Sequence, residues 1–324
     1  MDSFIERKPL SRRNFFRLSA VVIAGTGLAA CSNKIDAVIA TATRIPEATK
    51  SPTATLKPTK SPTLDPTATQ IVPDLERQLK KWGPAGSIPV FEYHGDKYDM
   101  YDGRYAMTPE SFIEQMTWFS DNDFHAVTGP ELTAFLEGKI DLPKRSMVLT
   151  TDSGEGSKNS LPRMIPVLKE TGMHFHSFIW TASMPPECLT WDFFEEGLNE
   201  GVLSIGSHSE KHSDFAKYSP RGVVSELKLS KKKIEERLGI SINSISWPLE
   251  SCPASAKDLL AIGYKYAFGG WSRDNVAALA VKKIDKNPWC LPRIFPPNEE
   301  GISMRPKGLT LKETMELYMG ERMW

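Results

Sequence analysis

Apolar residues from about residue 88 onward follow two periodicities in turn. Residues 88–93 and 146–151 are short, mainly apolar runs that contain residue types favoured in β-strands, and they have the length of buried strands. Between them, Phe112, Met116 and Phe119 recur at the three- and four-residue spacing of a helix with one buried face. This alternation predicts an α/β domain in which crossover helices join parallel strands.

Two helix starts carry capping signals. Thr108-Pro109 and Ser219-Pro220 each place a capping hydroxyl before a proline that suits the first helical turn. Gly239 is the expected end of the long second helix. The other predicted features are a helix that ends near Gly172 with Leu161, Ile165 and Leu168 inward, strands at residues 175–180 and 202–205, and inward-facing Val224, Leu227, Ile234 and Leu238 in the long helix.

These elements predict one domain over residues 74–324, and about 250 residues suit a single α/β barrel. The chain has 324 residues, of which 40% are hydrophobic and 25% are charged. This composition excludes a wholly disordered chain and a multi-span membrane protein. The chain contains 40 lysine and arginine residues and 40 aspartate and glutamate residues, so its formal net charge is zero. The overall charge therefore gives no indication of a nucleic-acid partner.

Residues 1–30 have the pattern of an export signal. Arg12-Arg13 precede an apolar run of small residues that is too short to span a bilayer. The arginine pair resembles a twin-arginine signal, and residues 28–31, Leu-Ala-Ala-Cys, resemble a lipobox with Cys31 as the acylated residue. We therefore expect a membrane-anchored lipoprotein outside the cytoplasm; an ordinary N-terminal helix is the alternative.

Residues 31–73 are predicted to be a disordered stalk. They are rich in threonine and proline, with Ser-Pro-Thr repeated at Ser51 and Ser61. Because they lack apolar periodicity they form no core, and such segments favour extended conformations at ~3.1 Å per residue. A membrane spacer and a simple unstructured tail share these properties, and only an anchor at Cys31 separates them.

Three further cysteines are Cys188, Cys252 and Cys290. In an oxidising compartment they allow at most one disulfide and one free thiol, and the pairing stays open. None lies in a Cys-x-x-Cys motif, which argues against a cysteine-based zinc site.

Candidate chemistry follows two of the predicted strands, where α/β barrels place their active sites. His208 and His212 come after the strand at residues 202–205, and imidazoles four residues apart converge on one metal if the turn is helical. Alone, the pair is also consistent with two unrelated surface histidines. Asp152 follows the strand at residues 146–151 and suits a base, a ligand or an Asx turn.

These residues resemble motifs of the polysaccharide deacetylase family (NodB homology, carbohydrate esterase family four). Residues 148–154, Val-Leu-Thr-Thr-Asp-Ser-Gly, are similar to the family's first motif, Thr-Phe-Asp-Asp-Gly. Residues 208–212 match its second motif, His-Ser/Thr-x-x-His, and residues 263–267 resemble a later Gly-Tyr-x-x-Ala. The resemblance covers roughly residues 88–295.

The resemblance implies an irregular (β/α) barrel of about seven parallel strands. It also implies a metal-dependent hydrolase that removes acetyl groups from an N-acetylated polysaccharide such as chitin, peptidoglycan or exopolysaccharide. In the family, one aspartate and two histidines hold a divalent metal, often zinc, and a second aspartate is the base. Carried over to this chain, His208 and His212 are metal ligands and Asp152 is the catalytic base.

The chain departs from the family pattern in three places. Ser153 replaces the carboxylate ligand, and a neutral hydroxyl is a poor zinc ligand. Residues 246–249, Ser-Trp-Pro-Leu, replace Arg-x-Pro-Tyr/Phe, so the arginine that would orient the base is missing from this motif. No histidine follows His212, so the late motif that carries the general acid is absent.

Further candidate site residues are His94, Pro248, Leu249 and Arg293. His94 or His176 is able to substitute in space for the missing histidine, although a packed or capping role is the commoner one for such residues. Exposed tryptophans suit stacking on sugar rings, whereas buried ones belong to the core; the candidates are Trp247, Trp271 and Trp289.

Two functions remain open at this point. One is a metal-dependent deacetylase with altered ligands, and the other is a catalytically degenerate protein of the same fold that binds glycans without turnover. A bound metal that a chelator removes favours the enzyme.

Overall fold

The computed structural model describes residues 73–96, 106–154, 157, 160–184, 189–253, 256–269, 280–283, 287–296 and 310–319. The predictions for the export signal, for Cys31, for the stalk up to residue 72, for Cys188 and for Trp271 lie outside these residues. Within the described part of the chain, no helix is long and apolar enough to cross a membrane.

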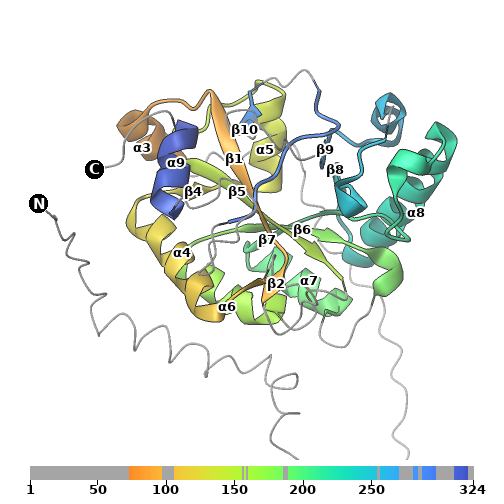
Figure 1. Ribbon diagram of the computed structural model, residues 1–324, viewed down its shortest axis with the longest axis horizontal. Coiled ribbons are helices and arrows are strands. Elements are labelled where there is room, and N and C mark those ends of the chain that lie inside the picture. Colours follow the sequence, from red (N-terminus) through yellow and green to blue (C-terminus); the bar gives the residue numbers. More distant parts are fainter. Residues whose placement is uncertain are drawn as a thin grey trace, which may run out of the picture.

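One curled, mostly parallel sheet lies at the centre (Figure 1). Its order is β10–β1–β5–β6–β7–β8–β9, and β4 pairs with the start of β5. Only β10 is antiparallel to its neighbour among the described strands of this sheet. The strands are β1 (Ser87–Tyr93), β4 (His125–Ala126), β5 (Ser146–Ser153), β6 (Phe175–Ile179), β7 (Leu203–Ser207), β8 (Ser244–Ser246), β9 (Tyr266–Phe268) and β10 (Ala280–Lys282), with a separate pair formed by β2 (Gly95–Asp96) and β3 (Ala106–Met107). The irregular (β/α) barrel with about seven parallel strands is confirmed.

A short segment ending at Ile294 bridges the two ends of the parallel sheet. Leu291 pairs with Phe268 of β9, and Ile294 pairs with Phe91 of β1, each as an isolated parallel bridge. Arg293 lies between these two bridges in sequence. The segment therefore brings Arg293 to the seam where the first and last parallel strands of the barrel approach each other.

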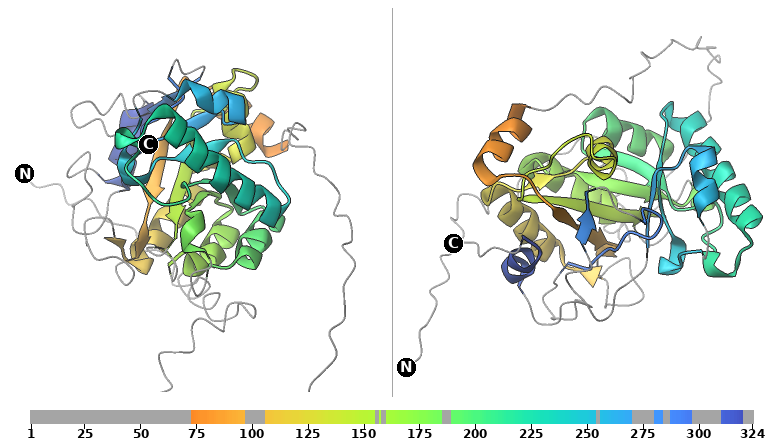
Figure 2. Two further views of the ribbon diagram at one scale, coloured as in Figure 1. Left: turned by 90° about the vertical axis from the view of Figure 1, so that its right-hand side faces the viewer. Right: turned by 90° about the horizontal axis from the view of Figure 1, so that it is seen from above.

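Helices surround this sheet (Figures 1 and 2). The α-helices are α3 (Pro73–Trp82), α4 (Pro109–Asp121), α5 (Gly129–Leu136), α6 (Ser160–Thr171), α7 (Trp191–Asn199), α8 (Pro220–Leu238) and α9 (Leu311–Met319); the 3₁₀ turns are η2 (Thr181–Ser183), η3 (Phe215–Lys217), η4 (Pro248–Glu250) and η5 (Lys257–Ile262).

The predicted helix ends are confirmed by their capping contacts. The Thr108 side chain accepts a hydrogen bond from the backbone of Ser111, and Ser219 caps α8 in the same way. Gly239 ends α8 at φ 66°, the left-handed conformation that glycine adopts without strain. In α8 the buried valine is Val223, whereas Val224 is only half-buried. That one-residue error arises because both valines lie near the edge of the buried stripe.

Side chains alternate between the two faces of the sheet. Val148 and Phe268 belong to an apolar cluster that contains no residue of α4, α6, α7 or α8, so this face is the one turned away from these helices. Leu149 belongs to the other cluster, which includes residues of α4, α6, α7 and α8. The two-residue period therefore directs Asp152 to the same face as Val148, and Ser153 to the outer, helix-covered face with Leu149.

Candidate functional site

Asp152 lies at the centre of a group of imidazoles and carboxylates at the C-terminal ends of the strands. Its Oδ2 is 3.7 Å from Nε2 of His208, which directly follows β7. A ring nitrogen of His94, which directly follows β1, lies within 4.8 Å of a carboxylate oxygen of Asp152 and one of Glu92. The His212 ring is centred 4.9 Å from that of His208. Four of the residues singled out in the sequence therefore lie together.

The two motif histidines approach each other through a tight loop. Ser209 and His212 have positive φ values of 66° and 55°. The backbone N–H of Ser209 donates to Ser207 Oγ, and that of His212 donates to Ser209 Oγ, both at 3.0 Å. The pair therefore approaches through a hydroxyl-braced loop with left-handed residues and not through a helical turn.

His208 is held in one tautomer. Its Nδ1 lies 2.9 Å from the carbonyl oxygen of Ser246; a carbonyl only accepts, so Nδ1 carries the hydrogen and Nε2 has the lone pair. Burial lowers the pKa of His208 to about 4 and also lowers the pKa of His212. Near neutral pH both rings are uncharged, which is the form of imidazole that binds metals.

Arg293 binds Asp152 through both of its terminal nitrogens. Nη1 donates to Oδ1 and Nη2 donates to Oδ2, each at 2.9 Å, and Ser246 Oγ donates to Oδ2 at 3.1 Å. Burial opposes ionisation of Asp152, but the charge and hydrogen bonds of Arg293 together with the nearby His208 and His94 outweigh it and hold the pKa of Asp152 well below its usual range. Residue 293, one of the further candidates, therefore supplies the guanidinium that position 246 lacks.

Two further carboxyl groups, which the sequence analysis missed, contact the same guanidinium. Nη2 of Arg293 lies 2.9 Å from Glu92 Oε1 and 2.6 Å from Glu250 Oε1. Burial raises the pKa of Glu92 well above its usual value, and the neighbouring carboxylates add to the rise that Arg293 opposes. The sequence did mark Glu92 as unusual, since it is the one charged residue in the apolar run at residues 88–93. No sequence feature marked Glu250.

Ser153 points away from this group. Its hydroxyl is 2.5 Å from the hydroxyl of Ser177 on β6, and the residue is fully buried. Pro248 and Leu249 follow β8; the proline is buried, whereas Leu249 is 66% exposed. Leu249 and Glu250 both have positive φ, 58° and 55°, and this turn directs the Glu250 side chain toward Arg293.

The remaining candidates belong to the core. His176 stacks on Phe178 with ring centroids 4.4 Å apart, and its Nε2 lies 3.0 Å from Ser244 Oγ. Trp247 is fully buried and donates from its indole to the Trp289 carbonyl at 2.7 Å. Trp289 is half-buried and packs against the apolar cluster that contains Leu149. The core interpretation is confirmed for Trp247, which offers no exposed face to a sugar.

The comparisons with known proteins agree with this arrangement. Residues 139–267 match the family model named polysaccharide deacetylase. This segment of the chain belongs to the polysaccharide deacetylase family. YxkH of Bacillus subtilis, which is named as a polysaccharide deacetylase, is 26% identical over 222 residues, covering 66% of this chain and 76% of that protein. The family consists of hydrolases that act on carbon–nitrogen bonds other than peptide bonds.

Solved deacetylase structures share the fold of this domain. IcaB from Ammonifex degensii superposes with a TM-score of 0.56 at 18% identity, covering 68% of this chain and 96% of that one. The Streptococcus pyogenes deacetylase PplD, solved in complex with acetate, also gives 0.56 at 20% identity, covering 69% and 100% of the two chains. At these identities the likeness concerns the fold.

The donor set of the deacetylase domain fits a divalent metal. Imidazoles of His94, His208 and His212 and the carboxylates of Asp152 and Glu92 are the nitrogen and oxygen ligands that zinc accepts in proteins.

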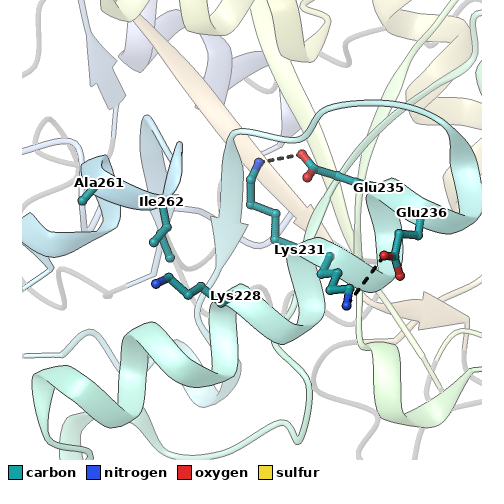
Figure 3. A pocket seen from close by; sticks show the side chains of 7 residues that line it. Lys228, Lys231, Glu235, Glu236, Ala261 and Ile262 are labelled. Carbon is teal, nitrogen blue, oxygen red and sulfur yellow. Dashed lines mark hydrogen bonds and ion pairs between the residues drawn. The ribbon is translucent and has the colours of Figure 1, made fainter.

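One surface pocket of the deacetylase domain lies apart from this group, between α8 and η5 (Figure 3). It is lined by Lys228, Lys231, Lys232, Glu235, Glu236, Ala261 and Ile262. Lys231 pairs with Glu235 at 2.7 Å and Lys232 with Glu236 at 3.8 Å. Its charges are largely compensated and it contains none of the candidate side chains, so we do not assign it a function.

Proposed function

We propose that this chain hydrolyses N-acetyl groups of an extracellular or cell-wall polysaccharide in a reaction that depends on a divalent metal, with zinc the first candidate. In that reaction water adds to the amide carbonyl, the carbon–nitrogen bond breaks, and acetate and a free amine leave. One observation carries the proposal: an ionised Asp152, bound by Arg293 at 2.9 Å, lies 3.7 Å from the lone-pair nitrogen of His208.

Each residue then has a defined role. Asp152 accepts the proton of the attacking water, and Arg293 with Ser246 fixes the orientation of its carboxylate. His208 and His212 are ligands for the metal, with Ser246 holding the tautomer of His208 through its carbonyl. When bound, the metal polarises the amide carbonyl and acidifies the water.

Acetate release from N-acetylglucosamine oligomers tests this function, with chelator-treated protein and with zinc or cobalt added back. We expect activity only with metal, and a loss of about a hundredfold or more in Asp152→Asn. Asp141→Asn is the matched control, since Asp141 is half-exposed and pairs with Lys283. Equal activity of wild type and Asp152→Asn contradicts the proposal.

The orientation of Ser153 favours one alternative. Since its hydroxyl contacts Ser177, position 153 supplies no ligand, and a domain with a weakened metal site is able to bind N-acetylated glycans without turnover. Oligomer binding in calorimetry together with no acetate release under any metal supports this alternative and contradicts the deacetylase proposal.

We also propose that the domain is exported and anchored to a membrane through Cys31. The sequence pattern at residues 1–31 supports this, and so does the Cys252–Cys290 disulfide, because such bonds persist mainly in oxidising compartments. Cys31→Ala should release the protein from the membrane fraction. Unchanged membrane attachment of that variant contradicts the anchor.

A further inference from the structure

We propose that Glu250 is a positioning residue for the base of this site: it fixes the guanidinium of Arg293, which in turn fixes the carboxylate of Asp152. The inference rests on the proposed function, in which Asp152 accepts the proton of the attacking water. The effect of Glu250 passes through Arg293, so Glu250 is not itself a catalytic group.

The ion pair of Arg293 and Asp152 needs an anchor outside itself. Nη1 and Nη2 of Arg293 donate to the two oxygens of Asp152 at 2.9 Å each. Such parallel bonds fix the two groups relative to each other, but they leave the pair able to shift as a unit. Nε of Arg293 has no hydrogen-bond partner among the described residues, and the bond from Nη1 to Thr150 Oγ1 is long at 3.5 Å. The placement of the pair therefore depends on what else binds Nη2.

Glu250 accepts the remaining hydrogen of Nη2. A terminal guanidinium nitrogen carries two hydrogens. One of them goes to Asp152 Oδ2 at 2.9 Å and the other to Glu250 Oε1 at 2.6 Å. Glu92 Oε1 also lies 2.9 Å from Nη2, but it is left without a hydrogen bond. Glu250 therefore provides the short, directional contact that holds the guanidinium.

One short segment binds both members of the ion pair. Ser246 Oγ donates to Asp152 Oδ2 at 3.1 Å, and Glu250, four positions later, accepts from Arg293. Without the Glu250 carboxylate, the Ser246 hydroxyl is the one side-chain anchor that this segment offers to the pair. We therefore expect the loss of Glu250 to loosen Arg293 first and the carboxylate of Asp152 with it.

The backbone that carries Glu250 is strained, which supports a functional role for its side chain. Leu249 and Glu250 have φ values of 58° and 55°, a region that glycine adopts without cost and other residues do not. Such strain persists only where the surrounding structure holds it, and it is common at functional sites. Here the N–H of Glu250 donates to the Trp247 carbonyl at 3.2 Å, and the disulfide from Cys252 to Cys290 lies just beyond the turn.

Steady-state acetate release by the metal-loaded full chain tests this role. Misplacing a catalytic group lowers kcat, whereas substrate binding is little affected. We expect Glu250→Ala to lower kcat about tenfold or more, with KM and calorimetric zinc affinity within about twofold of wild type. Glu250→Gln keeps an oxygen that accepts from Nη2 and should recover most of the loss. Glu137→Gln is the matched control, since Glu137 is a half-buried glutamate paired with Lys139 and Lys265.

Two kinetic outcomes overturn the inference. One is a wild-type kcat in Glu250→Ala. The other is a loss of kcat that comes with lower zinc affinity and reduced circular dichroism and that Glu250→Gln does not restore, because that pattern belongs to a merely structural residue.

Crystal structures of the two variants give a readout that does not depend on activity. In Glu250→Ala we expect Arg293 to turn and to lose at least one of its two bonds to Asp152, whereas Glu250→Gln should keep both. An unchanged ion pair in Glu250→Ala overturns the inference. A displaced Arg293 in that variant, together with a wild type that releases no acetate under any metal, supports the positioning contact and contradicts only the deacetylase function.

Discussion

Arg293 donates to both carboxylate oxygens of Asp152 at 2.9 Å, although 141 positions separate the two residues in the chain. Arg293 is fully buried, and its remaining partners are carboxyl groups of Glu92 and Glu250. Burial alone would lower the pKa of Arg293, but these three neighbours raise it well above its usual value. Arg293 therefore stays positively charged at neutral pH.

This ion pair predicts that Arg293 is not replaceable by lysine. Arg293→Lys keeps the positive charge but loses the two parallel hydrogen bonds that orient Asp152. We expect the variant to fold and its acetate release to fall by about tenfold or more, which is the usual loss when a residue that orients a functional side chain is replaced. Arg293→Ala should lower the free energy of unfolding by about 3–5 kcal/mol, because it leaves buried carboxylates unpaired. Arg77→Lys, at an exposed arginine, is the control for both measurements.

Ser153→Asp should destabilise the protein. Position 153 is fully buried against Ser177 on the outer face of the sheet, so an added carboxylate has no cation to pair with there. We expect a loss of about 2 kcal/mol or more in chemical denaturation, and no gain in zinc affinity. A variant with wild-type stability and tighter zinc binding would show that residue 153 faces the histidines.

The Cys252–Cys290 disulfide should stabilise both the fold and the site. It links the segment after Glu250 to the segment before Arg293 across a sequence separation of 38. Loop-closure entropy predicts a loss of about 3–4 kcal/mol when both cysteines become serine. Because Glu250 and Arg293 lie beside this link, acetate release should fall as well. Cys188→Ser is the control, and equal melting temperatures of the double variant and wild type would contradict the prediction.

The boundary between stalk and domain should lie at the start of α3. Leu75 is buried, and Arg77 and Lys81 each pair with Asp123 at 2.9 Å. Deleting residues 32–70 should change the free energy of unfolding by less than about 1 kcal/mol. Extending the deletion through residue 82 removes Leu75 and the ion pairs, and should cost several times as much. A large loss in the shorter deletion would show that the stalk packs on the barrel.

Stability should fall as the pH decreases below 6.5. Burial lowers the pKa of His176 to about 3, against about 6.5 in the unfolded chain. Between these values the unfolded state binds a proton that the folded state does not, so acid favours unfolding. For His176 alone we expect a loss of about 2 kcal/mol between pH 7 and pH 5. Urea denaturation of metal-free wild type and His176→Gln measures it, and the variant should show the smaller pH dependence.

The sequence by itself determined the local structure and most of the chemistry. Apolar periodicity gave β1, β5, β6 and β7, and the hydroxyl-proline starts gave α4 and α8, because these signals arise from contacts between residues close in the chain. Asp152, His208 and His212 were identified in the same way, since they follow predicted strands whose C-terminal ends meet on one side of the barrel.

Only the tertiary structure decided which distant residues complete the site. Arg293 and Glu250 meet Asp152 because the segment ending at Ile294 bridges β9 and β1 and because a left-handed turn follows Pro248. Neither contact leaves a periodic or spaced signal in the sequence. Ser153 shows the reverse case: its motif position suggested a ligand site, but the two-residue period of the strand turns its hydroxyl to Ser177. The pairing of Cys252 with Cys290 was likewise undetermined until the fold brought their segments together, because a disulfide depends on distance in space and not on separation along the chain.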